Sequence, residues 1–398
     1  MASKRRNMFY KNKKQMAVLR DPFYFTRIIL TVTGVTKPAR VGSRWYAVYT
    51  LMFGATAVAC FVLSALRSRE GFSTRHLTGR LPMESLIVFT ISIHTAAKFF
   101  NFLLRREKLF GLIDDVSRLG RTVAKISSEE TQKYVSRANT FAAVYFSTYH
   151  LVILLRFVFR TLVTGTGGLT TFGIMPLSFG IHLTRPLTTS LLEIVLVLPL
   201  TEIIMREQIL LFTVTMQICC QTKITSVSFQ HLAQISRIDG PSANELLRKS
   251  VKVHKKIIRI VRDLNSLLSP MFILEITLSS IICCVIGYHC ATYVKVNPQF
   301  GSDVLVLAGQ LFTPFIVCWC GSTIKSQNEI ILNSVYGSGW EELPVSLRKD
   351  LLIVMANCNQ PMSLNMKTSF VFDMKIFTNM LQASYSYYTM ISNLINDD

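Results

Sequence analysis

Long apolar runs separated by basic segments dominate the pattern of this chain. Six runs are long enough to cross a bilayer as helices: Trp45–Leu66, Leu81–Leu104, Phe141–Leu162, Leu187–Val214, Leu267–Tyr293 and Val304–Ile324. A hydrocarbon core about 30 Å thick needs about 20 helical residues, because unpaired backbone groups are too costly in lipid. A seventh run, Phe370–Leu394, mixes apolar and polar residues. The pattern predicts an all-α membrane protein with seven transmembrane helices.

The connecting segments differ in charge, and the difference predicts the orientation. Most of the 43 Lys and Arg residues lie in four segments, 1–44, 105–137, 215–266 and 325–369, whereas the segments between them carry few. Connections rich in Lys and Arg remain in the cytoplasm. The N-terminus is therefore predicted to be intracellular, and seven crossings place the C-terminus outside. This orientation is the reverse of that of a metabotropic seven-span receptor.

Composition agrees with a membrane protein and argues against several other classes. Hydrophobic residues make up 50% of the chain and charged residues 17%, whereas soluble proteins carry about 25% charged residues. The net charge of +20 does not indicate nucleic-acid binding, because the basic residues lie between apolar runs rather than on one soluble face. The basic start "MASKRRNMFYKNKKQ" lacks the apolar core of a cleaved signal peptide.

No pattern in the chain predicts an enzyme, a cofactor or a metal site. Glu193, Glu202 and Glu207 lack a nucleophile or metal ligands at a recognisable spacing, and we expect a structural role or an ion pair with Arg206. Most of the nine cysteines lie inside apolar runs and are interpreted as small buried hydrophobes. The pair Cys60 and Cys290 leaves one bridge open near the outer surface.

The segment 325–369 contains a predicted cytoplasmic helix. In "LPVSLRKDLLIVMANCNQP" a single helical stripe forms, made of Leu347, Leu351, Val354, Met355 and Cys358. Two interpretations stay open, a helix resting on the membrane surface and a packing surface between subunits. The modest charge of the helix favours the second, because helices on a membrane surface usually have a strongly basic polar face.

The seventh run carries a polar stripe along one side of a helix, formed by Asn379, Gln382 or Ala383, Ser386, Met390, Asn393 and Asp397. Such a stripe at bilayer depth faces protein or water rather than lipid. One interpretation is a buried bundle helix whose hydroxyls bond to its neighbours. The other is a pore-lining helix in which Met390 and Leu394 close the path by dewetting.

The last third of the chain resembles the insect odorant receptors, seven-span proteins with an intracellular N-terminus that form ligand-gated cation channels. The resemblance lies in "NSVYGSGWEELPVSLRKDLLIVMANCNQPMSL" and in the closing "FTNMLQASYSYYTMISNL". Gustatory receptors, the related alternative, end with Thr-Tyr, five hydrophobic residues and Gln-Phe. Here Ser386-Tyr387 and Asn393-Leu394 stand at those positions, which indicates an odorant receptor.

The resemblance implies a tetramer whose last helix lines a central pore. It implies four parts: a cytoplasmic segment 1–44, a six-helix bundle 45–324 with the odorant pocket in its outer half, an anchor region 325–369 and a pore helix with its tail, 370–398. The gate would comprise Ser386, Met390, Asn393 and Leu394, and the subunit interface Leu347, Leu351, Val354 and Met355.

The resemblance also implies partners, a location and a pocket. The co-receptor of the family has a longer fourth loop, so this chain resembles a tuning subunit that joins co-receptor subunits in the plasma membrane of olfactory dendrites, surrounded by membrane lipid. The implied pocket residues are Ile87, Ile91, Tyr149, His150, Ile153 and Phe157. His150 is either a satisfied bundle residue or the polar contact for a small volatile with one ester, alcohol or carbonyl group.

The function that follows is an odorant-gated, non-selective cation channel subunit. The alternatives are a gustatory receptor channel subunit and a metabotropic seven-span receptor.

Overall fold

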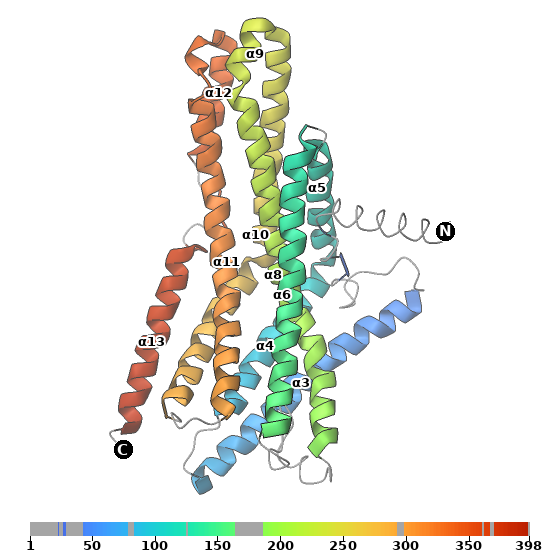
Figure 1. Cartoon of the computed structure of the whole chain (residues 1–398), viewed down its shortest axis with the longest axis vertical. Coiled ribbons are helices and arrows are strands. Elements are labelled where there is room, and N and C mark those ends of the chain that lie inside the picture. The colour runs from blue at the N-terminus through green and yellow to red at the C-terminus, as the bar shows by residue number, and fades with distance from the viewer. Residues whose placement is uncertain are drawn as a thin grey trace, which may run out of the picture.

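A computed structural model describes residues 23, 27–28, 43–78, 83–124, 126–163, 186–292, 298–359, 362–366 and 370–396 (Figure 1). Its helices are α3 (Ser43–Thr78), α4 (Met83–Leu104), α5 (Arg106–Ala124), α6 (Ser128–Val163), α8 (Pro186–Gln230), α9 (Leu232–Ile238), α10 (Gly240–Thr292), α11 (Pro298–Tyr336), α12 (Val345–Cys358) and α13 (Met374–Asn396). A 3₁₀ turn, η2 (Trp340–Glu342), precedes α12, and two short strands precede α13.

Each of the seven predicted spans corresponds to a helix over most of its length, and several of these helices extend well beyond the apolar run. By length and hydropathy, four stretches of the described chain qualify as membrane spans: Ser128–Leu155, Thr201–Gln230, Gly240–Tyr288 and Val304–Tyr336. Helix α10 has 53 residues, or about 80 Å at 1.5 Å per residue, which exceeds the thickness of a bilayer. The basic segment before the fifth run is therefore the continuation of the same helix.

The long helices give the molecule an elongated shape with two distinct ends (Figure 1). Helices α9 and α12 lie at one end, which we call the α12 end. The last turn of α13 and the first turn of α8 lie at the opposite end. Helices α6 and α11 run side by side and both pack on α8, whereas α13 lies on the flank against α10 and α11. Every bundle helix therefore has several neighbours, but α13 is covered on one side only.

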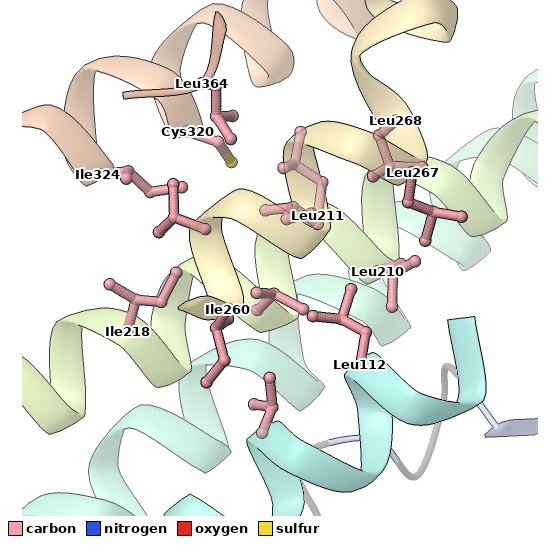
Figure 2. Packing of buried hydrophobic residues seen from close by; sticks show 14 of the residues in the cluster. Leu112, Leu210, Leu211, Ile218, Ile260, Leu267, Leu268, Cys320, Ile324 and Leu364 are labelled. Atoms are coloured by element: carbon pink, nitrogen blue, oxygen red, sulfur yellow. The ribbon is translucent and has the colours of Figure 1, made fainter. Parts of the chain in front are cut away.

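The main core lies where α5, α8, α10 and α11 meet (Figure 2). Leu112, Leu211, Ile260 and Cys320 come from these four helices, and their side chains point toward one another. Each is almost completely buried. Burial of apolar surface contributes about 25 cal/mol per Å², so this shared core fixes the helices to one another toward the α12 end.

A second core at the α12 end contains the predicted cytoplasmic helix. Leu347, Leu351 and Val354 of α12 are at most 4% exposed, and Met355 packs against the same cluster. Their partners come from α8, α9, α10 and α11 and are Phe229, Leu232, Ala243, Leu247, Ile331 and Val335. The helix is thus confirmed. Leu347, Leu351 and Val354 are already covered within one chain, so they are not free to form the predicted contacts between subunits, whereas Met355 stays partly exposed.

A small hairpin leads the chain into α13. Strands β1 (Asn365–Met366) and β2 (Phe370–Val371) pair antiparallel. The seventh run therefore begins as a strand and not as a helix, and α13 starts only at Met374. The carboxylate of Asp373 accepts hydrogen bonds from the backbone N–H groups of Lys375 and Ile376 at 3.1 and 3.3 Å. This cap fixes the first turn of α13.

The hairpin is held against α11 at a position that requires glycine. A Cβ atom at Gly321 would lie 1.8 Å from the carbonyl oxygen of Phe372. The ring of Phe372 is fully buried and packs edge-on against Phe272 of α10 at 5.3 Å. Close approach of the two backbones therefore sets where α13 leaves the bundle.

Candidate functional site

A buried ionic cluster lies where α4, α8 and α10 cross. The Lys98 Nζ atom is 2.5 Å from Glu275 Oε2 and 3.2 Å from Glu207 Oε2. His94, one turn before Lys98 on α4, places Nε2 3.0 Å from the same Glu275 oxygen. All four side chains are at most 6% exposed. With its amide turned toward the lysine, Gln208 accepts a hydrogen bond from Nζ at 3.2 Å, beside the bond to Glu275 and the ion pair with Glu207.

Arg206 adds a second cation to this cluster from α8. Its guanidinium carbon lies 4.5 Å from the ring centre of Phe102, and an amino group donates to the carbonyl oxygen of Lys98 at 3.3 Å. Two buried cations therefore balance the carboxylates of Glu207 and Glu275. A buried charge is tolerated only when it is paired and hydrogen-bonded. The two cations and the two carboxylates therefore depend on one another.

A second ion pair joins α6 to α8 nearer the opposite end. His150 Nε2 lies 3.1 Å from Glu202 Oε1, and His150 Nδ1 lies 2.8 Å from the carbonyl oxygen of Phe146. Both ring nitrogens therefore face oxygen acceptors. A proton is needed on each contact, so either the imidazole carries both protons or Glu202 carries one of them. Glu202 and Glu207 are thus ion-paired as expected, but with His150 and Lys98 on other helices. The Glu193 side chain lies outside the described residues.

The predicted pocket residues lie beyond the ionic cluster, toward the opposite end. Ile91 and Ile87 extend the face of α4 that carries Lys98 and His94. On α6, Tyr149 packs in a cluster with Tyr145, Met205 and Ile209, and Ile153 is buried one turn further. Helix α8 contacts both α4 and α6. The side chain of Phe157 lies outside the described residues, as does that of Cys290, the suggested partner of Cys60.

The structure leaves the polar stripe of α13 exposed. Asn379, Gln382, Ser386, Met390 and Asn393 are all exposed, with Met390 at 53%. The hydroxyl of Ser386 donates only to a carbonyl of its own helix, at 3.0 Å. The side chains of Leu394 and Asp397 are outside the described residues.

The opposite side of α13 packs on α10. The Ser384 hydroxyl lies 3.1 Å from the hydroxyl of Ser280 and donates to the Ser280 carbonyl at 3.2 Å. Met380, one turn earlier, is 4% exposed. Within the described chain, α13 therefore presents its buried side to the bundle and the predicted stripe to the outside.

Lys98, His94 and Glu275 were not among the sequence-predicted site residues. Each lies inside an apolar run, and ionisable groups in a membrane span normally mark a functional or paired position. That signal identifies the residues. It does not identify their partners, because Lys98 and Glu275 are 177 residues apart.

A family model with the description "7tm Odorant receptor" matches residues 80–385, which include the ionic cluster and the first half of α13. The chain belongs to this odorant receptor family.

Known relatives of this receptor are insect proteins. "Odorant receptor Or2" of Anopheles gambiae is 26% identical over 162 residues, and "Odorant receptor 10" of Aedes albopictus is 23% identical over 161 residues. Each alignment covers 42% of the relative and 39% or 40% of this chain, so less than half of either relative is matched.

Solved structures extend the likeness of fold over nearly the whole receptor. The olfactory receptor OR5 of Machilis hrabei in complex with eugenol matches with a TM-score of 0.73 at 14% identity, covering 95% of this chain and 99% of that one. A second structure of the same OR5 matches with a TM-score of 0.70. At this identity the comparison shows that the two chains share a fold.

Proposed function

We propose that the receptor is an odorant-gated, non-selective cation channel subunit whose pore is lined by α13. The observation that carries the proposal is the exposed stripe of this helix. A bilayer-depth helix with Asn, Gln and Ser on its outer face would be costly in lipid, whereas water in a symmetric pore would hydrate these groups. The packed Ser384 side would hold each α13 to its own bundle.

In the closed state, Met390 and Leu394 would form the constriction. Their spacing of four residues sets them one turn apart on one side of the helix, with Asn393 next to them. Rings of apolar side chains from several subunits exclude water and block ions. An odorant opens the channel only by as much as it binds the open state more tightly than the closed state.

The Met390→Ser substitution tests the pore. A smaller, polar side chain destabilises a dry constriction, so current without odorant should rise, or the reversal potential under bi-ionic conditions should shift. The matched control is Tyr388→Phe, because Tyr388 is partly buried toward α10 rather than on the stripe. An unchanged Met390→Ser channel together with a Tyr388→Phe variant of altered permeability would place a different face of α13 at the pore.

For the ligand, we propose a small volatile with one oxygen function, bound between α4, α6 and α8 on the far side of the ionic cluster from α12. The OR5 neighbour is described in complex with eugenol, a small oxygen-bearing molecule. Because both ring nitrogens of His150 are engaged within the chain, we assign the polar contact to Tyr149 instead. Tyr149→Phe should shift the rank order of a volatile panel, whereas Leu151→Ala, exposed at 52% on the same helix, should not.

The receptor would act as a tuning subunit with co-receptor partners in the plasma membrane of olfactory dendrites, with the α12 end in the cytoplasm. Contacts between subunits would then use the exposed face of α12, where Val345, Leu352 and Ile353 are 49–60% exposed. An epitope placed after Asp398 and labelled on intact cells tests the orientation. A cytoplasmic epitope would contradict the channel proposal and favour a metabotropic receptor.

A further inference from the structure

A pocket of about 430 Å³ lies between α6, α8 and α11, on the α12 side of the ionic cluster. It is separate from the region proposed for the odorant. The walls are aromatic and aliphatic, and the exposed Arg137, Lys223 and Ile330 stand at its edge. Figure 1 shows α6 and α11 side by side over this region, each packed on α8.

The apolar part of the pocket is a stack of rings. Phe212 of α8 and Trp319 of α11 stack with centres 5.6 Å apart and planes 15° apart. Phe141 of α6 also stacks on Phe212, with ring centres 3.8 Å apart. Phe141 begins the apolar run of α6 and Phe212 lies near the end of the run of α8, so the stack marks one edge of the hydrocarbon region.

The two cations lie beyond this edge, at different distances from it. Arg137 precedes Phe141 by about one turn, and its guanidinium carbon lies 5.7 Å from the ring centre of Tyr134. Lys223 follows Phe212 by eleven residues, or about 16 Å along α8. The pocket is thus apolar where acyl chains lie and cationic at the level of the headgroups.

The two cations have no carboxylate at the pocket. The residues that line it include Arg137 and Lys223 and no Asp or Glu. Neither cation is within 4.0 Å of an acidic oxygen in the part of the chain that the structure describes. Thr323 and Gln327 of α11 add neutral hydrogen-bonding groups beside them. A single phosphate would therefore find two cations and several donors on the lining. Glu130 of α6 interacts electrostatically with Tyr134 but does not line the pocket.

We propose that this pocket binds an anionic phospholipid of the cytoplasmic leaflet. Its phosphate would lie between Arg137 and Lys223, and one acyl chain would lie against the Phe212–Trp319 stack. The inference rests on the proposed orientation, because only the cytoplasmic leaflet meets the α12 side of the bundle. Such a lipid would connect α6, α8 and α11, and two of these helices, α6 and α8, also form the region proposed for the odorant.

Quenching of Trp319 fluorescence tests this directly. The chain has three tryptophans, so Trp45→Phe together with Trp340→Phe leaves Trp319 as the reporter. The purified receptor is placed in nanodiscs that contain a small fraction of phosphatidylserine or phosphatidylcholine brominated on an acyl chain. We expect brominated phosphatidylserine to reach half-maximal quenching at a lower mole fraction than brominated phosphatidylcholine. Each of the two basic residues should lower this mole fraction roughly fivefold.

Charge variants decide between a built site and general contact with lipid. The double variant Arg137→Ala/Lys223→Ala should lose the preference for phosphatidylserine. The control Lys108→Ala/Arg121→Ala removes two exposed cations from α5 and should keep it. Equal quenching by both lipids in the parent, or a preference that survives in Arg137→Ala/Lys223→Ala, would overturn the proposal.

Two further outcomes distinguish a bound lipid from a free anion and one leaflet from the other. Loss of the preference on adding inorganic phosphate would assign the pocket to a free anion and overturn the lipid. The readout needs no channel current, so a failed pore proposal leaves it unaffected. If labelling shows the α12 end to be extracellular while the preference persists, the site stands but belongs to the outer leaflet, and the proposed leaflet is wrong.

Discussion

Polar residues are used in opposite ways at the crossing of α4, α8 and α10 and along α13. At the crossing, Lys98, Glu207 and Glu275 are fully buried and pair with one another. Along the stripe of α13, the polar residues are exposed, and Ser386 bonds only within its own helix. The polar groups at the crossing find their partners within the chain. Those of the α13 stripe are free to contact water or another subunit.

This difference indicates that the ionic cluster stabilises the fold, whereas the stripe of α13 has a role outside the folding of one chain. A buried ionic cluster is costly to desolvate and contributes mainly by fixing which helices meet, since removal of one partner leaves an uncompensated charge. An exposed polar stripe contributes nothing to the fold of one chain, so its role must lie with water or with other subunits. Substitutions in the two regions should therefore affect different measurements.

The largest expected effect comes from Lys98→Met. It leaves Glu207 and Glu275 buried without their shared cation, which should destabilise the receptor by about 3–5 kcal/mol. We expect loss of surface expression and of a thermal unfolding transition in detergent. Adding Glu207→Gln and Glu275→Gln to Lys98→Met should restore part of the surface expression and of the stability. The control Lys252→Met, at an exposed position of α10, should behave as wild type. Normal expression of Lys98→Met would mean that the cluster does not determine the stability of the fold.

A smaller effect is expected where α13 joins the bundle. In Gly321→Ala the new methyl group meets the Phe372 carbonyl, so the hairpin must move, at a cost of about 1–3 kcal/mol. Gly309→Ala on the same helix has open space around its Cβ and should be neutral or stabilising by up to about 1 kcal/mol. Thermal unfolding of the two purified variants compares them. Equal melting temperatures would mean that the hairpin does not hold α13.

These regions also differ in how far the sequence could predict them. The sequence pattern predicts the number of spans, the α12 helix and the polar stripe of α13, because each is a property of one helix. The partners of Lys98 could not be predicted, since they come from helices distant in the chain. The stripe of α12 has an ordinary amphipathic pattern, and periodicity alone does not say whether another subunit or the same chain covers it.

The contact between α13 and α10 should contribute about 1 kcal/mol. Ser384→Ala removes the hydroxyl that bonds to Ser280, whereas Ser386→Ala removes one from the exposed stripe. Only the first should lower the melting temperature, and Ser280→Ala/Ser384→Ala should cost less than the two single changes together. If Ser386→Ala destabilises the purified receptor as much as Ser384→Ala, the two sides of α13 are not distinct.

The smallest effect concerns a buried histidine that has no ionic partner in the described chain. His254 lies in the basic part of α10, outside the apolar run. Its side chain is 3% exposed in the core at the α12 end, and its Nε2 atom lies 3.7 Å from the thiol sulfur of Cys358. Burial lowers the pKa of His254 below its usual 6.5 and raises that of the Cys358 thiol to about 11, so both are neutral at pH 7. A proton on His254 would be buried without an acidic partner in the described chain.

Stability from His254 should therefore be complete above pH 6.5 and fall as the pH decreases below it, because the unfolded chain binds the proton more readily. One proton changes the free energy of unfolding by at most about 1.4 kcal/mol per pH unit. We expect the melting temperature to fall between pH 7.5 and 5.5 by less in His254→Gln than in wild type. His231→Gln, an exposed position, should retain the wild-type dependence, which separates His254 from the other histidines. A His254→Gln receptor with the full pH dependence would mean that the titrating group lies elsewhere.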